Sequence, residues 1–149
     1  MQASVQSVWE QFERIHQAIF QWSEGLSDDQ LNWRPPAKDS NSIGNLMSHI
    51  LGAELFSIVE RVGGESVGRD RPGEFHDRVT RDMLLQRRAD VEKRVRQTLE
   101  KLTPADFSRV VQAPIGEVTV DKFLLYLISH FSGHMGQVIL TRKLIDAQH

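Results

Sequence analysis

The clearest sign of a helical bundle in this chain is the stretch VQSVWEQFERIHQAIFQW at residues 5–22. Its apolar residues recur every three or four positions, a spacing that places them on one face of an α-helix. They are Val5, Val8, Phe12, Ile15, Ile19 and Trp22. Gly25 follows as a helix-stop signal. Because an apolar stripe of this kind must be covered, we expect further amphipathic helices to pack against it.

Three other segments predict those partner helices. Residues 41–62 open with a Ser/Asn-rich stretch that can supply an N-cap, and they end at Gly63-Gly64. Residues 80–102 have apolar side chains on one side and a dense run of charges on the other, which we interpret as a solvated face. Thr119 is a candidate N-cap for a fourth helix that runs to about residue 145. The pattern predicts an all-α, four-helix bundle.

The predicted helices are joined by segments of different kinds. Residues 63–79 form a polar connection between the second and third helices that is longer than most within a compact domain. Residues 110–118 contain a Pro114–Gly116 turn and predict a brief hairpin. LSDDQL at 26–31 and LTPADF at 102–107 repeat one pattern after the first and third helices. If this repeat is structural, the bundle consists of two helical hairpins.

Composition limits the class of protein. The chain has 149 residues, which predicts a single domain over 1–149. Its net charge of −2 gives no basic excess for nucleic acid or a membrane surface. It has no cysteine, which excludes disulfides, thiolate metal ligands and a cysteine nucleophile. The first ten residues have no basic n-region and no apolar h-region, so we expect no signal peptide. We also expect no membrane-length apolar run, and we predict a cytoplasmic protein.

Three histidines on apolar helix faces are the candidate functional residues. His130 and His134 are four residues apart, which places them on one face of the fourth helix, about 6 Å apart along its axis. His49 lies on a similar apolar face of the second helix. Buried imidazoles need partners for their nitrogens, and three neutral imidazoles suit zinc, nickel or iron. The alternative is that each is an isolated core histidine bonded to a carbonyl or hydroxyl group.

Other polar residues carry weaker signals. Asn45, Glu54, Tyr126 and Gln137 lie near the histidines in sequence, and we expect each to be an ordinary core or surface residue. Glu13 and His16 form half of a di-iron Glu-x-x-His motif, which such a site needs twice, so we discount them. His76 and His149 are expected to face solvent. The sequence has no His-Glu-x-x-His, Gly-x-Ser-x-Gly, phosphate-loop or dinucleotide motif.

Three patches together resemble the DinB/YfiT-like superfamily of metal-dependent four-helix-bundle proteins. They are LSDDQLNWRP at 26–35, SIGNLMSHI at 42–50 and HFSGHMGQV at 130–138. The resemblance implies a long connection between the second and third helices and a homodimer. It also implies a divalent metal, zinc or nickel, bound by His49, His130 and His134. Phe56 stands where relatives often have tryptophan, which leaves the shape of the pocket open.

The resemblance also suggests a chemistry. Related proteins include bacillithiol transferases and mycothiol-dependent isomerases, so it implies a metal-dependent S-transferase acting on a small-molecule thiol and an electrophile. Three protein ligands leave one metal position open, as in catalytic sites, and with no cysteine in the chain the thiol must be a cosubstrate. Two alternatives remain: a non-catalytic metal-binding or dimerisation module linked to stress response, and a metal-dependent hydrolase. Whether the protein is an enzyme stays open at this point.

Overall fold

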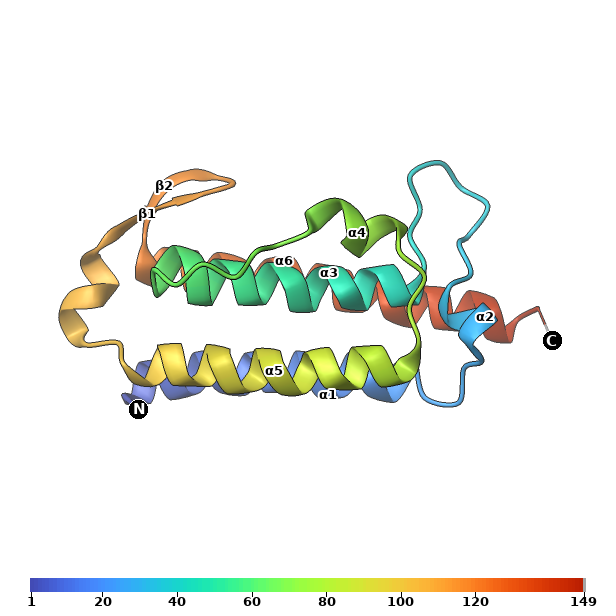
Figure 1. Ribbon diagram of the computed structural model, residues 1–149, viewed down its shortest axis with the longest axis horizontal. Helices are drawn as coiled ribbons and strands as arrows, with labels where there is room; N and C mark the ends of the chain where they lie inside the picture. The colour runs from blue at the N-terminus through green and yellow to red at the C-terminus, as the bar shows by residue number, and fades with distance from the viewer. Residues whose placement is uncertain (149) are drawn as a thin grey trace.

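The computed structural model describes residues 1–148, and most of them lie in helices that form a bundle (Figure 1). The long helices are α1 (Ala3–Trp22), α3 (Ile43–Leu55), α5 (Arg81–Glu100) and α6 (Val120–Asp146). The π-helix η1 (Phe56–Val62) continues α3 without a break. The predicted all-α four-helix bundle is therefore confirmed.

The direction of the helices explains why one connection is long. In Figure 1, α3 and α5 both run from the right end of the bundle to the left, whereas α1 and α6 run from left to right. The chain must therefore return along the length of the bundle between α3 and α5, and residues 63–80 do so across its surface. This connection contains a short helix, α4 (Arg71–His76), which the sequence interpretation did not predict.

The packing of the helices differs from two separate hairpins. The main contacts of α1 are with α5 and α6, and those of α3 are with α4, α5 and α6. The two helices of each expected hairpin, α1 with α3 and α5 with α6, thus lie across the diagonal of the bundle, because the segments that join them are long enough to cross its ends. The expected pair of hairpins is wrong, although its sequence repeat is structural. Both copies fold as short capped turns, α2 (Asp28–Leu31) after Ser27 and η2 (Pro104–Ser108) after Thr103.

The apolar stripe of α1 forms the centre of the core with one exception. Val5, Phe12, Ile15 and Ile19 are almost completely buried, as predicted. Trp22 instead is 37% exposed, because it lies in the last turn of the helix beyond the covered part of the stripe, where Lys143 lies over its ring. At the helix ends, Ser42 accepts a hydrogen bond from the Asn45 N–H as the predicted N-cap of α3.

The remaining elements follow the sequence with small differences. The hairpin forms from β1 (Val110–Ala113) and β2 (Gly116–Thr119), paired antiparallel. Thr119 occupies the N-cap position of α6 without a side-chain cap bond to its backbone; its hydroxyl bonds the Asp121 carboxylate instead. His76 is exposed as expected, and the expectation for His149 lies outside the described residues.

Helix α6 departs from one expectation about membranes. At 27 residues, with a mean hydropathy of 1.2 in its most apolar window, it is long and apolar enough to span a bilayer, contrary to the expectation that no such segment exists. Length and composition alone are weak evidence, since core helices of soluble proteins meet the same criterion. In this fold α6 packs along α1 and α3.

The charged side of α5 is not entirely a solvated face. Glu92 accepts hydrogen bonds from Arg88 (2.6 Å) and from Nδ1 of His16 (3.0 Å), which is completely buried in α1. The other ring nitrogen of His16 bonds Glu54 of α3 at 2.6 Å. His16, Glu54 and Glu92 therefore form an ionic cluster that joins three helices. It does not form a metal site, because the two carboxylates bind opposite nitrogens of the ring.

Candidate metal centre

The fold brings the three predicted histidines together. His49 comes from α3, and His130 and His134 come from successive turns of α6, which packs against α3. Nε2 of His130 lies 3.5 Å from Nε2 of His49 and 3.3 Å from Nε2 of His134. One ring nitrogen from each histidine falls within 4.8 Å of the other two. His49 is buried and the other two are half-buried, so the cluster lies at the edge of the core.

The spacing of these nitrogens fits one divalent metal ion. Zinc binds imidazole nitrogens at about 2.0–2.1 Å, which places two tetrahedral ligand atoms about 3.4 Å apart. The two separations from Nε2 of His130, 3.3 and 3.5 Å, match that value, and the ligand atoms of His49 and His134 lie within 4.8 Å of each other. Three protein ligands would leave a tetrahedral ion one further position for water or a ligand atom, as in catalytic rather than structural zinc sites.

Hydrogen bonds at the far side of two rings fix their orientation. Nδ1 of His49 donates to Oε1 of Glu74 at 3.0 Å, and Nδ1 of His134 donates to Oε1 of Gln137 at 2.7 Å. With their Nδ1 atoms protonated, both rings present the lone pair of Nε2 to the cluster. Metal-binding histidines commonly have such an outer partner, which also makes the ligand more basic.

The surroundings of His130 and His134 favour the neutral form of each imidazole, which is the form that binds a metal ion. Burial, together with the neighbouring His134, His49 and Arg69, lowers the pKa of His130 to about 4. Burial also lowers the pKa of His134, against an opposing effect of its bond to Gln137. For Glu74, burial raises the pKa, but hydrogen bonds from Arg69 and His49 outweigh it and hold the pKa below its usual value. The lowered pKa values keep His130 and His134 neutral, and the carboxylate that bonds His49 is ionised.

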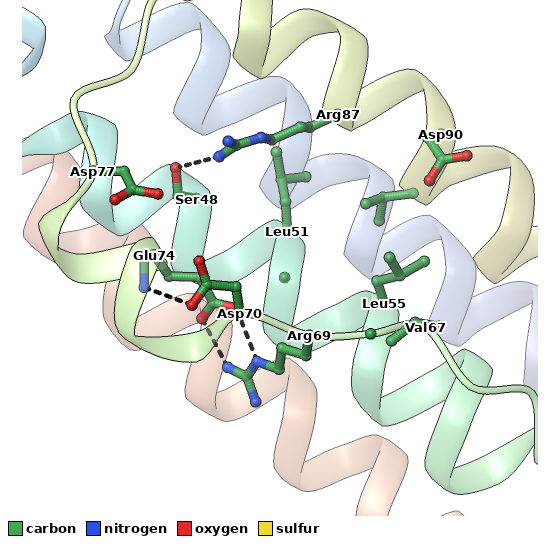
Figure 2. Close-up of a pocket in the computed structure, with 14 residues that line it drawn as sticks. Ser48, Leu51, Leu55, Val67, Arg69, Asp70, Glu74, Asp77, Arg87 and Asp90 are labelled. Carbon is green, nitrogen blue, oxygen red and sulfur yellow. Dashed lines mark hydrogen bonds and ion pairs between the residues drawn. The ribbon is translucent and has the colours of Figure 1, made fainter.

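Glu74 is the main site residue that the sequence interpretation missed. It lies in α4, 25 residues from His49. Figure 2 shows it facing Arg69, whose Nε and Nη2 each bond one of its carboxylate oxygens at 2.8 Å. Gly52 of α3 allows this close approach, because a Cβ there would come within 2.2 Å of Oε2 of Glu74. Nothing in the local spacing marks Glu74, since its role depends on how the long connection crosses α3.

Asn45 has a role that we did not expect. Its side-chain amide donates to the backbone carbonyls of Glu74 and Asp77, both at 3.1 Å, and its oxygen accepts from Arg34 at 2.8 Å. Arg34 also bonds the carbonyl of Phe75. These bonds fasten the α4 segment to the start of α3, and they thereby place Glu74 beside His49.

The other three polar candidates divide between the site and the core. Gln137 bonds His134, and the Tyr126 ring stacks on His130 with centroids 5.6 Å apart, so both belong to the site. Glu54 belongs instead to the ionic cluster with His16.

The histidines open onto a cavity of about 290 Å³. Its walls include the aromatic residues Phe56, Phe75 and Tyr126, the arginines Arg61, Arg69 and Arg71, and Pro114 of the hairpin. The π-helix η1 supplies Phe56 and Arg61, and π-helical turns are frequent at functional sites. Phe56, at the position where the resemblance expects tryptophan, has two guanidinium groups over its ring, Arg61 at 4.9 Å and Arg69 at 5.3 Å.

A second cavity, of about 250 Å³, lies between α3, α5 and the connection that contains α4 (Figure 2). Glu74 and Arg69 line it together with Ser48, which accepts a hydrogen bond from Arg87 at 3.1 Å. None of the three histidines lines this cavity. Of these two cavities, the candidate metal centre therefore faces the first.

The geometry defines a helical-bundle protein with a three-histidine cluster that is compatible with a divalent metal ion. The DinB superfamily matches residues 11–138, most of the chain, and the protein belongs to that superfamily. A conserved protein from Enterococcus faecalis, known from its crystal structure, has the same fold, with a TM-score of 0.73, 19% identity and 99% of each chain covered. Comparison with curated proteins gives no match.

Proposed function

We propose that this protein is a divalent-metal-dependent enzyme in which His49, His130 and His134 hold the ion and a small-molecule thiol is the nucleophile of an S-transfer reaction. The observation that carries the metal assignment is the convergence of one ring nitrogen from each histidine within 4.8 Å of the other two, with Nε2 of His130 3.3 and 3.5 Å from its two neighbours. A divalent ion bound there lowers the pKa of a coordinated thiol or water and so supplies a nucleophile near neutral pH. Zinc and nickel are the expected ions.

Each neighbouring residue has a part in this proposal. Glu74 and Gln137 keep the Nε2 atoms of His49 and His134 directed at the ion. Arg69 keeps Glu74 ionised and in place. Phe56, Phe75 and Tyr126 shield the site from bulk water on the cavity side. The choice of a thiol as nucleophile comes from the resemblance to thiol-dependent family members and from the lack of cysteine in the chain.

Metal content tests the first half of this proposal. Protein purified without a histidine tag is expected to contain stoichiometric zinc or nickel by elemental analysis. His49→Ala and His134→Ala should lose that metal, because two remaining imidazoles bind far more weakly than three. His76→Ala is the matched control, since His76 is exposed and lies outside the cluster. Wild-type protein that remains metal-free after incubation with both ions would contradict the proposal.

Turnover tests the second half. Metal-loaded protein is assayed with a panel of low-molecular-weight thiols and an electrophile such as 1-chloro-2,4-dinitrobenzene. The proposal expects turnover that disappears in His134→Ala and on chelation. A fully loaded protein that is inactive with every thiol but cleaves ester substrates would favour the hydrolase. One that is inactive in both assays would favour the non-catalytic module linked to stress response.

We also propose that the protein is a cytoplasmic homodimer. The support for the homodimer is a stripe on α6 that is exposed, contains no charge and repeats every three or four residues. It consists of Leu125, Ser129, Gly133, Gly136, Leu140 and Leu144. A stripe along one helix can pair with its own copy about a two-fold axis, and its glycines allow the two helices to approach closely.

A further inference from the structure

The charges around the histidine cavity are of one sign. The described residues that line it include three arginines and no aspartate or glutamate. Imidazole ligands are neutral, so a bound divalent ion would keep its full positive charge and add to that of the arginines. A cavity with this lining attracts anions and repels cations.

Two of the three arginines have no carboxylate partner. Arg69 donates two hydrogen bonds to the carboxylate of Glu74. Arg61 donates one hydrogen bond to the backbone carbonyl of Gln112 at 2.7 Å, and Arg71 lies over the Phe75 ring at 5.3 Å. Within residues 1–148, neither Arg61 nor Arg71 forms an ion pair. Their guanidinium groups are thus held at the cavity wall, and each has N–H donors available to a ligand.

The fixed guanidinium groups of Arg61 and Arg71 favour recognition of an oxyanion. A guanidinium group presents parallel N–H donors that match the oxygens of a carboxylate or phosphate. Stacking on Phe56 and Phe75 restricts Arg61 and Arg71 before any ligand arrives, which reduces the entropy lost on binding. Arg61 comes from η1 and Arg71 from α4, so a ligand between them would contact two elements that border the cavity.

We propose that the substrate of the three-histidine site is a small anion whose carboxylate or phosphate group is bound by Arg61 and Arg71. The inference rests on the proposed function, because it assumes that the substrate also reaches the ion held by the histidines. It goes further by assigning a substrate class and two residues that determine specificity. Arg69 has a different part, since it positions Glu74.

Three thiols that differ in charge provide the test: 3-mercaptopropionate (anionic), 3-mercapto-1-propanol (neutral) and cysteamine (cationic). Each is titrated into the cobalt(II)-loaded protein, and binding is followed by the visible absorption of the ion, without any measurement of activity. The anionic thiol is expected to bind about tenfold more tightly than the neutral one, the size of one hydrogen-bonded charge interaction. Cysteamine should bind most weakly. Competition by acetate and by inorganic phosphate distinguishes the two oxyanion classes.

Arginine variants assign the effect to residues. Arg61→Gln and Arg71→Gln should each reduce the preference for the anionic thiol to about threefold or less, with unchanged affinity for the neutral thiol. Arg78→Gln is the matched control, because Arg78 lies in the same connection but pairs with Asp29 outside the cavity. Circular dichroism and the melting temperature confirm that each variant is folded.

The outcomes separate this inference from the proposed function. Failure to bind cobalt(II) would refute the metal site itself. Cobalt-loaded protein that binds all three thiols equally, or variants that keep the full preference for the anion, would overturn the anion inference alone. A cobalt spectrum that responds to none of the thiols would contradict both the thiol proposal and the inference.

Discussion

At the scale of single residues, the cluster depends on groups that bind no metal themselves. Glu74 accepts a hydrogen bond from Nδ1 of His49 and another from Arg69. One carboxylate therefore connects the α4 segment to a candidate metal ligand. Gln137 has the same relation to His134 from within α6. These contacts fix which nitrogen of each ring faces the cluster.

Replacing Glu74 tests this dependence. Glu74→Gln removes the charge and weakens the hold on His49, and we expect metal affinity to fall about 10- to 100-fold. Competition with a chromophoric chelator measures that affinity. The control is Glu65→Gln, because Glu65 lies in the same connection but pairs with Arg94 at the surface. Unchanged metal affinity in Glu74→Gln would show that the carboxylate has no role at the site.

At the scale of elements, His16 links three helices through charge. Burial by itself lowers the pKa of His16, but the charge and hydrogen bond of Glu54, with further effects from Glu92, outweigh it and raise the pKa to about 9. Arg88 is the other charged group bound to Glu92. Removing one partner of a buried ion pair leaves the other charge uncompensated, which typically costs about 3–5 kcal/mol. His16 therefore ties α1 to α3 and α5.

The stability of the bundle should depend on pH through this residue. The pKa of His16 rises from 6.5 to about 9 on folding, so the folded state binds the proton more tightly than the unfolded chain. The stabilisation is then fully present below pH 6.5 and is lost as the pH rises to about 9, by on the order of 3 kcal/mol. Urea unfolding in the presence of a chelator at several pH values measures it.

Two variants make this result specific. His16→Gln should be less stable at pH 6 and should lose most of the decline in stability between pH 6.5 and 9. His76→Ala should keep the decline, because that residue is exposed and away from the cluster. A wild-type protein whose stability is flat over this range would contradict the ionic interpretation of the His16 contacts.

At the scale of the whole molecule, the exposed stripe on α6 predicts a dimer. Leu140 is 59% exposed and Leu125 65% exposed, and large apolar side chains grouped in this way often mark an interface. Leu140→Glu should convert a dimer to a monomer, since it places a charge within the apolar stripe that forms the two-fold contact. Light scattering after size-exclusion chromatography gives the mass. Leu85→Glu on α5 serves as control, and a monomeric wild type at micromolar concentration would refute the dimer.

The helical bundle and the positions of its histidines follow from local patterns in the sequence. The three-to-four spacing in α1 and the order of apolar segments predict four helices, because burying a stripe is the strongest local constraint on a helix. His130 and His134 share a face for the same geometric reason. With the resemblance to the DinB superfamily, these patterns predict that His49, His130 and His134 form one cluster.

How these parts meet depends instead on contacts between segments that are distant in the sequence. Because α3 and α5 run in the same direction, the connection between them returns along the bundle. This path places Glu74 beside His49, and it places Arg69 and Arg71 at the wall of the cavity. In the sequence His16 belongs to half of a di-iron motif, whereas in the structure it is the centre of an ionic cluster. Its partners come from two other helices, so the sequence around His16 does not predict them. Local periodicity fixes which face of a helix is buried, whereas contacts between distant segments depend on the path of the chain in space.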